Sequence, residues 1–560
     1  MQRRSRARRW RVLGAALALL AAPACTHDKA APPPPATTAS GVAPTALPSL
    51  SALYRPRTPA PAGLRRGGGA VVAVAAEAVV FDPFVLAGDT PATSELTPLW
   101  LPGLWRVGPR GVRTPWLAAG SPLVSRDGRR VSVDLRADAK WSDGSRITAA
   151  DVAATWRYAR RAGGSWRSAY DELSGVETPT PTRVVLVLRQ PSVSWMRLFV
   201  APTGVLPARR IPAATASRGY VPSVAGGPFV LATRTAGLGS TWRRTPAPWP
   251  GSDPALDRLD VRVVPDFTTA RDLLARGAVD AVAPADAPHA AARLAGPGVR
   301  TATDRSTGRT TALVLRTDRG PLADVRVRRA LALSFDRPAF SDVLLRDSGV
   351  VADDLVATGS PGYRSAFRRW RRDVARARQL LSDAGWRETT ADRPRRKGGR
   401  DLALTVAAAS PADLSDAVVR GLQLQARAVG VQLELAAADA DVAYSLAREG
   451  GADLYYTRLD TDVDSDVGRR LATLAAPGGP NLSRWRDATA TRLFAAVDRS
   501  RDLPSLDAAI AAAMARVADQ VPVLPLYSLY PVTVARGLAP QPPVAGYAGP
   551  FADIDRWFRA

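Results

Sequence analysis

Cysteine, histidine and lysine are almost missing from this chain of 560 residues, which contains one cysteine and two histidines. Because a disulfide needs two partners, the single Cys25 excludes an intramolecular disulfide framework. The chain has no His-Glu-x-x-His, Gly-x-Ser-x-Gly or P-loop pattern, which are typical of zinc peptidases, serine hydrolases and nucleotide-binding enzymes. The scarcity of histidine also argues against a direct metal site. We therefore predict a protein that is not an enzyme and carries no cofactor or metal.

The basic charge of the chain comes almost entirely from arginine. Lysine is found only as Lys29, Lys140 and Lys397, yet the formal net charge is +25. Such a charge is typical of nucleic-acid-binding proteins, but an arginine-rich composition together with a basic leader explains it equally well. We favour the second interpretation and predict no nucleic-acid partner. The densest later cluster, residues 364–378, is interpreted as a solvated face that could also contact anionic wall polymers or lipid headgroups.

The first 25 residues have the features of an export signal. Arginines within residues 3–11 precede an apolar run, residues 12–24, which is too short to span a bilayer and fits a signal peptide. The run ends in Ala22-Pro23-Ala24-Cys25, which resembles a bacterial lipobox. Lipidation of Cys25 would tether the mature protein to the outer face of the cell membrane. The alternative is an ordinary cleavage site and a free, periplasmic protein.

A spacer is predicted after the leader. Residues 26–66 are dominated by alanine, proline, threonine and serine, including four consecutive prolines at 32–35. Such a segment cannot bury enough apolar surface to fold, and proline keeps it extended. We expect a disordered link between the anchor and a folded region.

The most informative stretch of the chain is residues 131–156. Apolar and polar residues alternate over 131–135, which predicts a half-buried strand. Asp143-Gly144 predicts a tight turn, because glycine accepts a positive φ without a clash. Thr148 and Asp151 have the spacing of a capping box, which predicts a helix beginning after Thr148.

Six further motifs are found along the chain, one before this stretch and five after it. They are Phe81-Asp82-Pro83, Val205-Leu206-Pro207, Gly226-Gly227-Pro228-Phe229, Pro321–Leu331 with Phe335-Asp336-Arg337, Asp373–Trp386 and Val521–Tyr527. Together with Trp141–Trp156, these motifs resemble the family 5 extracellular solute-binding proteins, the dipeptide and oligopeptide receptors of ABC importers. Within them, Asp324 and Asp373 are predicted to be helix N-caps.

The resemblance implies an α/β, two-lobed periplasmic-binding-protein-like (Venus-flytrap) fold with an extra subdomain inserted in the first lobe. We expect a signal peptide over 1–25, the spacer over 26–66 and lobe I over 67–305, with the inserted subdomain at about 101–204. Lobe II is expected over 306–520, and residues 521–560 are expected to return to lobe I. Ligand would lie between the lobes and be enclosed by a hinge motion.

The resemblance also implies a ligand site near the end of lobe II. Peptide receptors of the family hold the α-ammonium group of the ligand on an aspartate, and the corresponding position here is Asp462, or Asp460 in the alternative register. Leu459 then replaces a family tryptophan, while Trp485 and Phe81 are further candidate ligand contacts. The alternatives are a solvated acidic loop at 460–466 and a core role for Trp485. The spacing of these acids resembles part of an EF-hand, but its glycine and final glutamate are missing, so no metal is predicted.

We therefore expect a membrane-tethered, monomeric receptor that captures a small organic solute, a di- or oligopeptide first, for ABC permease subunits and their ATPase. A sugar, an opine, or chelated nickel or haem are alternative ligands within the same fold. Two other classes remain open, namely an exported cell-wall hydrolase and a signalling or structural lipoprotein that has lost transport.

Overall fold

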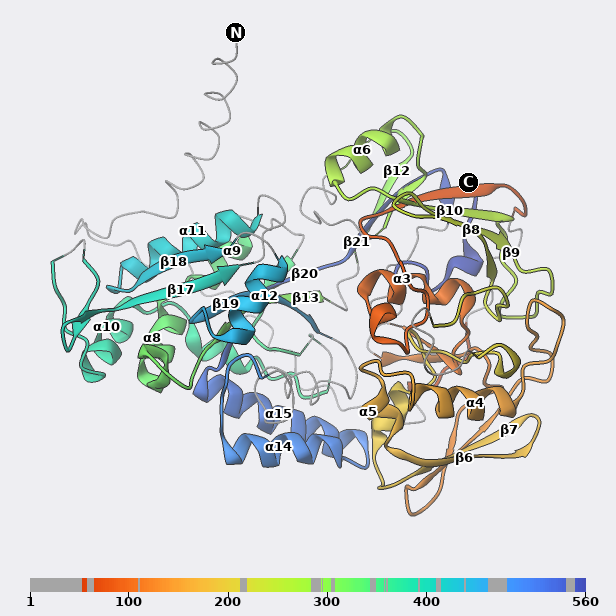
Figure 1. Cartoon of the computed structure of the whole chain (residues 1–560), viewed down its shortest axis with the longest axis horizontal. Coiled ribbons are helices and arrows are strands. Elements are labelled where there is room, and N and C mark those ends of the chain that lie inside the picture. Colours follow the sequence, from red (N-terminus) through yellow and green to blue (C-terminus); the bar gives the residue numbers. More distant parts are fainter. Residues whose placement is uncertain are drawn as a thin grey trace, which may run out of the picture.

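The computed structural model describes residues 53–57, 65–108, 111–211, 219–283, 294, 296–303, 308–342, 349–356, 358, 361–390, 393–408, 414–437, 440–461, 481–539 and 549–559. Two large β-sheets, each covered by helices, form two lobes that lie side by side (Figure 1). We call the part built on the seven-stranded sheet lobe I and the part built on the six-stranded sheet lobe II.

The sheet of lobe I is centred on β1 (Gly69–Val74), the buried strand with which the folded region begins. β1 pairs in parallel with β10 (Arg258–Val263) and β11 (Ala281–Val282), and the other pairs are antiparallel. The full strand order is β12 (Val299–Thr303), β21 (Val532–Arg536), β11, β1, β10, β9 (Gly239–Arg244) and β8 (Phe229–Thr235). Strands that are far apart in sequence thus become neighbours.

The sheet of lobe II is mixed. β13 (Gly308–Leu315) lies between two antiparallel partners, β19 (Leu454–Thr461) and β20 (Val523–Leu529). The strand order is β14 (Gly349–Val351), β20, β13, β19, β17 (Ala403–Ala408) and β18 (Gln432–Ala437). β17 runs parallel to β18 and β19, and the helices α11 and α12 connect these strands, as parallel pairing requires.

The helices divide between the lobes in chain order. Lobe I has α3 (Pro91–Trp100), α4 (Ala149–Ala159), α5 (Arg167–Tyr170) and α6 (Phe267–Ala275), and lobe II has α8 (Val325–Ser334), α9 (Arg337–Phe340), α10 (Val374–Asp383), α11 (Leu414–Arg427), α12 (Ala440–Glu449), α14 (Ala488–Asp498) and α15 (Leu503–Gln520). The helix caps follow the sequence predictions. The Asp324 carboxylate accepts from the Arg326 N–H at 2.9 Å, and that of Asp373 accepts from Arg376 N–H at 2.9 Å.

A third, smaller sheet lies in the range predicted for the inserted subdomain. Its strand order is β4 (Leu123–Val124), β5 (Arg130–Asp134), β7 (Arg183–Leu188) and β6 (Leu173–Thr180). The predicted strand at 131–135 is β5 within one residue, and the capping box before α4 is confirmed, with the Thr148 N–H donating to the Asp151 carboxylate at 2.8 Å. Short strands also pair as β2 (Trp105–Val107) with β3 (Arg113–Pro115), β15 (Arg396–Lys397) with β16 (Arg400–Asp401), and β22 (Leu538–Ala539) with β23 (Phe558–Arg559).

Two of the recognised motifs pack on one another. The Ser142 N–H donates to the Ala225 carbonyl at 2.7 Å, and the Ser142 hydroxyl accepts from the Ala225 N–H at 3.1 Å. A Cβ atom on Gly226 would come within 2.9 Å of the Trp141 ring, so the glycine permits this contact. The Trp-Ser-Asp-Gly turn and the Gly-Gly-Pro-Phe segment are therefore structural partners, with no chemistry of their own.

A buried carboxylate joins three parts of lobe I. Asp82 is fully buried and accepts hydrogen bonds from the Phe84 N–H at 2.9 Å, the Tyr158 hydroxyl at 2.6 Å and the Tyr220 N–H at 2.7 Å. Burial raises the pKa of Asp82, while the three hydrogen bonds oppose that rise. Because its folded pKa lies above the unfolded value, the stability that Asp82 contributes through protonation is present at acid pH and is lost as the pH rises through the folded pKa.

Residues 53–57 differ from the spacer expected over 26–66, because they pack on lobe I. Leu53 and Tyr54 are both 7% exposed, and Arg57 donates to Asp555 at 2.6 and 3.0 Å and to Asp553 at 2.7 Å. Burial raises the pKa of Asp555, but the nearby Arg106 and Arg57 charges outweigh that and hold it below its usual value. We call residues 53–57 the N-terminal strap. Leu53 and Tyr54 at its start give this short segment an apolar surface to bury, and Arg57 at its end adds the ion pairs.

The return of the chain to lobe I also differs from the predicted boundary at 521. β20 pairs with β13 and β14 inside the sheet of lobe II, and the chain rejoins the sheet of lobe I only at β21. The reason is that the apolar run at 521–527 is buried by its antiparallel partner β13, which sequence pattern alone does not identify. The other domain limits remain predictions.

We expect Tyr158→Phe to lower the free energy of unfolding by about 1.5–3 kcal/mol at neutral pH, because it removes a donor from a buried carboxylate. The loss should shrink on acidification, since a protonated Asp82 needs that donor less. Urea unfolding from pH 8 down to the lowest pH at which the protein stays folded measures both effects. Tyr444→Phe, at a tyrosine that is 40% exposed, is the control. A loss that stays constant over the whole range would show that Asp82 is not the group that Tyr158 stabilises.

Candidate functional site

The chain passes between the lobes twice in the described part of the structure. β12 of lobe I is followed by β13 of lobe II, and β20 of lobe II is followed by β21 of lobe I after only Tyr530 and Pro531. The passage from β20 to β21 lies in the middle of the molecule (Figure 1), and the strands on both sides of it are paired with those that flank the other passage, β12 with β21 and β13 with β20. Two adjacent strand connections with little else beside them are typical of a hinge.

The end of β19 lies next to this hinge. Leu459 pairs with Thr310 and Asp460 with Arg309, near the start of β13. Leu459 is half-buried and packs against the core of the lobe. Asp460 is placed by its backbone alone, and Asp462 lies outside the described residues. Two of the predicted ligand contacts, Leu459 and Asp460, are thus on the strand that ends where the chain crosses between lobes.

Two hydroxyl pairs, one on each face of the sheet, link the strands below the hinge. The Tyr456 and Tyr527 hydroxyls are 2.6 Å apart, linking β19 to β20, and the Thr310 and Ser528 hydroxyls are 2.7 Å apart, linking β13 to β20. Tyr456 and Tyr527 are 4% and 2% exposed. The sequence analysis missed these pairs, because only the pairing of β13 with both strands brings the members of each pair together.

A buried arginine, Arg337, forms a hydrogen bond to the backbone of β20. Arg337 is 1% exposed and donates to the carbonyl groups of Ala352 at 2.6 Å, Phe367 at 2.7 Å and Pro525 at 3.3 Å. Burial lowers the pKa of Arg337, and Asp353 at 3.3 Å partly offsets that effect. Arg337 of the Phe-Asp-Arg motif therefore fixes the hinge strand β20 to two neighbouring segments. The motif was recognised in the sequence, but these contacts were not predicted from it.

Trp485 and Phe81 lie in the cores of their lobes. Trp485 is 4% exposed, and its carbonyl accepts from the Asn481 side chain at 3.0 Å. Phe81 is 5% exposed and stands edge-on to Trp242, with ring centroids 5.6 Å apart. The core role weighed for Trp485 accounts for its burial, and Phe81 packs in the same manner. A ligand-contact role for either stays a prediction.

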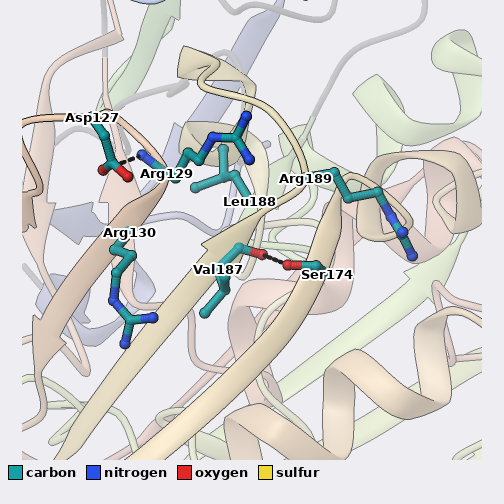
Figure 2. A pocket seen from close by; sticks show the side chains of 7 residues that line it. All are labelled: Asp127, Arg129, Arg130, Ser174, Val187, Leu188 and Arg189. Carbon is teal, nitrogen blue, oxygen red and sulfur yellow. Dashed lines mark hydrogen bonds between the residues drawn. The ribbon is translucent and has the colours of Figure 1, made fainter.

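A separate surface hollow of about 440 Å³ lies on the small four-stranded sheet (Figure 2). Two of the three arginines that line it already have partners, since Arg130 donates to Glu177 at 3.0 Å and Arg189 donates to the Asp171 carbonyl at 2.7 Å. The remaining lining residues are Asp127, Arg129, Ser174, Val187 and Leu188. In Figure 2 the guanidinium groups of Arg129 and Arg189 lie apart from one another, so they do not converge on one ligand.

Other expectations concern charge, metal and anchor. The arginines of the 364–378 cluster are exposed, in agreement with a solvated face. Among the described residues, no group of three or more histidine, cysteine or acidic side chains is placed to hold a metal ion, and no helix has the length and apolar character needed to cross a membrane. Cys25, His27 and His289 lie outside the described residues.

The family model of the bacterial extracellular solute-binding proteins, family 5, matches residues 113–479. The chain is 27% identical over 405 residues to Protein XP55 of Streptomyces lividans, which covers 69% of this chain and 71% of that protein. It is 24% identical over 358 residues to the nickel-binding periplasmic protein of Escherichia coli K12 (61% and 67%). It is 24% identical over 403 residues to the glutathione-binding protein GsiB of the same strain (69% and 74%).

Solved structures share the whole architecture. The periplasmic EDTA-binding protein EppA superposes with a TM-score of 0.79 at 19% identity, covering 89% of this chain and 97% of that one. The oligopeptide-binding protein AppA from Bacillus subtilis, in complex with a nonapeptide, superposes with a TM-score of 0.73 at 18% identity, covering 89% and 100%. The predicted α/β, two-lobed fold is confirmed.

Proposed function

The chain belongs to the bacterial extracellular solute-binding proteins of family 5, and on this premise we propose that it captures a small organic solute, a di- or oligopeptide first, and delivers it to an ABC permease. The family consists of receptors that release their ligand unchanged. We extend that property to this chain and propose that it has no catalytic activity.

The observation that carries the proposal is that the chain crosses twice between two separate sheets. Each lobe has its own sheet, and the only described strand connections between them are β12 to β13 and β20 to β21. Such an arrangement lets the lobes rotate as bodies without breaking the strand pairing of either sheet. A ligand that contacts both lobes shifts the population towards the closed form by the free energy of the contacts made only there.

The relatives support two classes of ligand. The structure of AppA with a nonapeptide and the glutathione-binding protein favour a peptide. The nickel-binding protein and the EDTA-binding protein EppA favour a metal held in an organic chelator as the second candidate. Such a chelate needs few protein ligands, which fits a chain with two histidines.

Asp462 is our proposed partner for the ligand ammonium group, and Asp460 is the alternative. Asp460 is the second-last residue of β19, and Asp462 comes directly after that strand in the sequence. A carboxylate that meets an ammonium group in a closed and drier cleft gains strength from the lower local dielectric. Leu459, where the family has a tryptophan, would leave more room beside that ammonium group.

We expect di- and tripeptides to raise the melting temperature of the purified protein, because a ligand that binds only the folded state stabilises it. The panel for this thermal-shift assay includes cello-oligosaccharides, an opine, and nickel with and without a chelator. Mass spectrometry of the recovered ligand should show the intact peptide. A shift with another class and none with peptides would reassign the solute, and cleavage of the ligand would refute a receptor role.

We expect Asp462→Asn to weaken binding of the peptide that gives the largest shift by about 1–3 kcal/mol, the usual loss for a hydrogen bond to a charged group. Asp460→Asn tests the alternative register, and Asp257→Asn, at an exposed carboxylate in lobe I, is the control. Isothermal titration calorimetry gives the three affinities. If only Asp460→Asn weakens binding, the register moves by two residues.

For the location of the protein, we propose a lipid anchor on Cys25, with the receptor monomeric on the outer face of the cell membrane. The support is the lipobox-like sequence before Cys25 and the proline-rich segment that follows it. The N-terminal strap would then fix the end of that segment to lobe I through the Arg57 ion pairs.

We expect the full-length protein expressed in a bacterial host to enter the detergent phase of a Triton X-114 extraction, and Cys25→Ser to move it to the aqueous phase. The expected change is a loss of most of the detergent-phase protein, because a diacylglycerol supplies the apolar area for membrane binding. Equal partition of the two forms would indicate an ordinary cleaved signal.

A further inference from the structure

The two lobes make a second contact, away from the hinge. The 3₁₀ helix η3 (Val193–Arg197) follows β7 in the region of the small sheet, and the end of α14 belongs to lobe II. The Ser192 hydroxyl donates to the Asp498 carbonyl at 2.8 Å, and the Val193 N–H donates to the Ser500 carbonyl at 2.9 Å. In Figure 1, α14 reaches α5 of lobe I on the opposite side of the gap from β20 and β21.

The contact is built from groups that helix ends leave unsatisfied. Asp498 is the last residue of α14, and the carbonyl groups in the last turn of a helix have no partner within it. The N–H groups at the start of η3 are in the same position, and Ser192 is its N-cap. Each lobe therefore supplies the hydrogen-bonding groups that the other lacks.

The contact is also dry. Ser192, Val193 and Ser500 are 9%, 2% and 4% exposed. The cluster of buried apolar residues continues from lobe I into lobe II, so the lobes touch through packed side chains as well. When the contact opens, water must take the place of these buried hydrogen-bond partners. Because each hydrogen bond requires a particular geometry, the contact favours one relative position of the two lobes.

The lobe I side of the contact is rigid. The Ser194 hydroxyl and the Arg197 guanidinium both bond to the Glu172 carboxylate behind η3. Trp195 stacks on Tyr54 of the N-terminal strap, with ring centroids 6.5 Å apart and planes 10° apart. η3 is thus held from the small sheet and from the strap together.

We propose that Ser192 and Val193 of lobe I and the α14 end at Asp498–Ser500 form a latch that holds the lobes closed on the side away from the hinge. The hinge strands fix the axis, and the latch sets the free-energy difference between the open and closed arrangements. This inference concerns the lobes themselves and holds whatever solute the protein binds.

Val193→Pro tests the latch by deleting one donor. Proline suits this first helical position, since the preceding Ser192 is extended, with φ −157° and ψ 146°. Val193→Ala loses the same packing but keeps the N–H, and is the matched control. Ser192→Asp retains an N-cap acceptor but cannot donate to the Asp498 carbonyl, and Ser192→Thr retains the hydroxyl.

Spin labels on cysteines at the exposed positions Thr178 in β6 and Ala375 in α10, in a Cys25→Ser background without ligand, report the distance between the lobes. We expect Val193→Pro and Ser192→Asp to raise the ratio of long to short distances about fivefold, which corresponds to ~1 kcal/mol for one hydrogen bond. Ser192→Thr should match the parent protein, and Val193→Ala should raise the ratio clearly less than Val193→Pro does, because it keeps the N–H.

Circular dichroism first establishes that each variant is folded. Should Val193→Pro not fold, the comparison of Ser192→Asp with Ser192→Thr decides alone. Equal distance distributions in folded donor-deleted and control variants would overturn the latch. That result leaves the proposed solute-binding function intact, because the thermal-shift panel tests it separately.

Discussion

The constraint on which this structure depends is that one chain builds two sheets and crosses between them at one place. Pairing of β12 with β21 and of β13 with β20 brings the two crossings together, although they are separated by more than 200 residues. Since the two sheets are not paired with one another, relative motion of the lobes need not break the hydrogen bonds of either sheet. Everything argued about binding follows from that arrangement.

Buried polar groups hold the segments that the sheets alone would not fix. Asp82 joins the end of β1 to α4 and to the loop before β8, and Arg337 joins α9 to β20 and to two loops of lobe II. Arg57 and Asp555 join the first and last described segments of lobe I. In each case most of the buried donors and acceptors are paired, which is the condition under which burying charge is tolerated, although the Arg337 Nε has no partner among the described residues.

The family motifs prove to be structural in this protein. Trp141 and Ser142 pack on Ala225 and Gly226. Asp151 caps α4 and also accepts a hydrogen bond from the Ala208 N–H at 2.8 Å. Such contacts explain why a fold can be recognised from these residues while the solute is not. The residues that we propose to choose the solute, Leu459 with Asp460 or Asp462, are in β19 or follow it in the sequence, where the chain departs from the family pattern at Leu459.

The sequence by itself determined the α/β character, the capped helices at 149–159, 325–334 and 374–383, and the family, because periodicity and capping are local properties of a chain. Only the tertiary structure decided that residues 53–57 pack on lobe I, that β20 belongs to lobe II, that Trp485 and Phe81 are core residues, and that Ser192 meets the end of α14. Each of these depends on which distant segment buries a given surface. The local pattern shows that a residue is apolar or can donate a hydrogen bond. It does not show which residue, hundreds of positions away in the sequence, that side chain will contact.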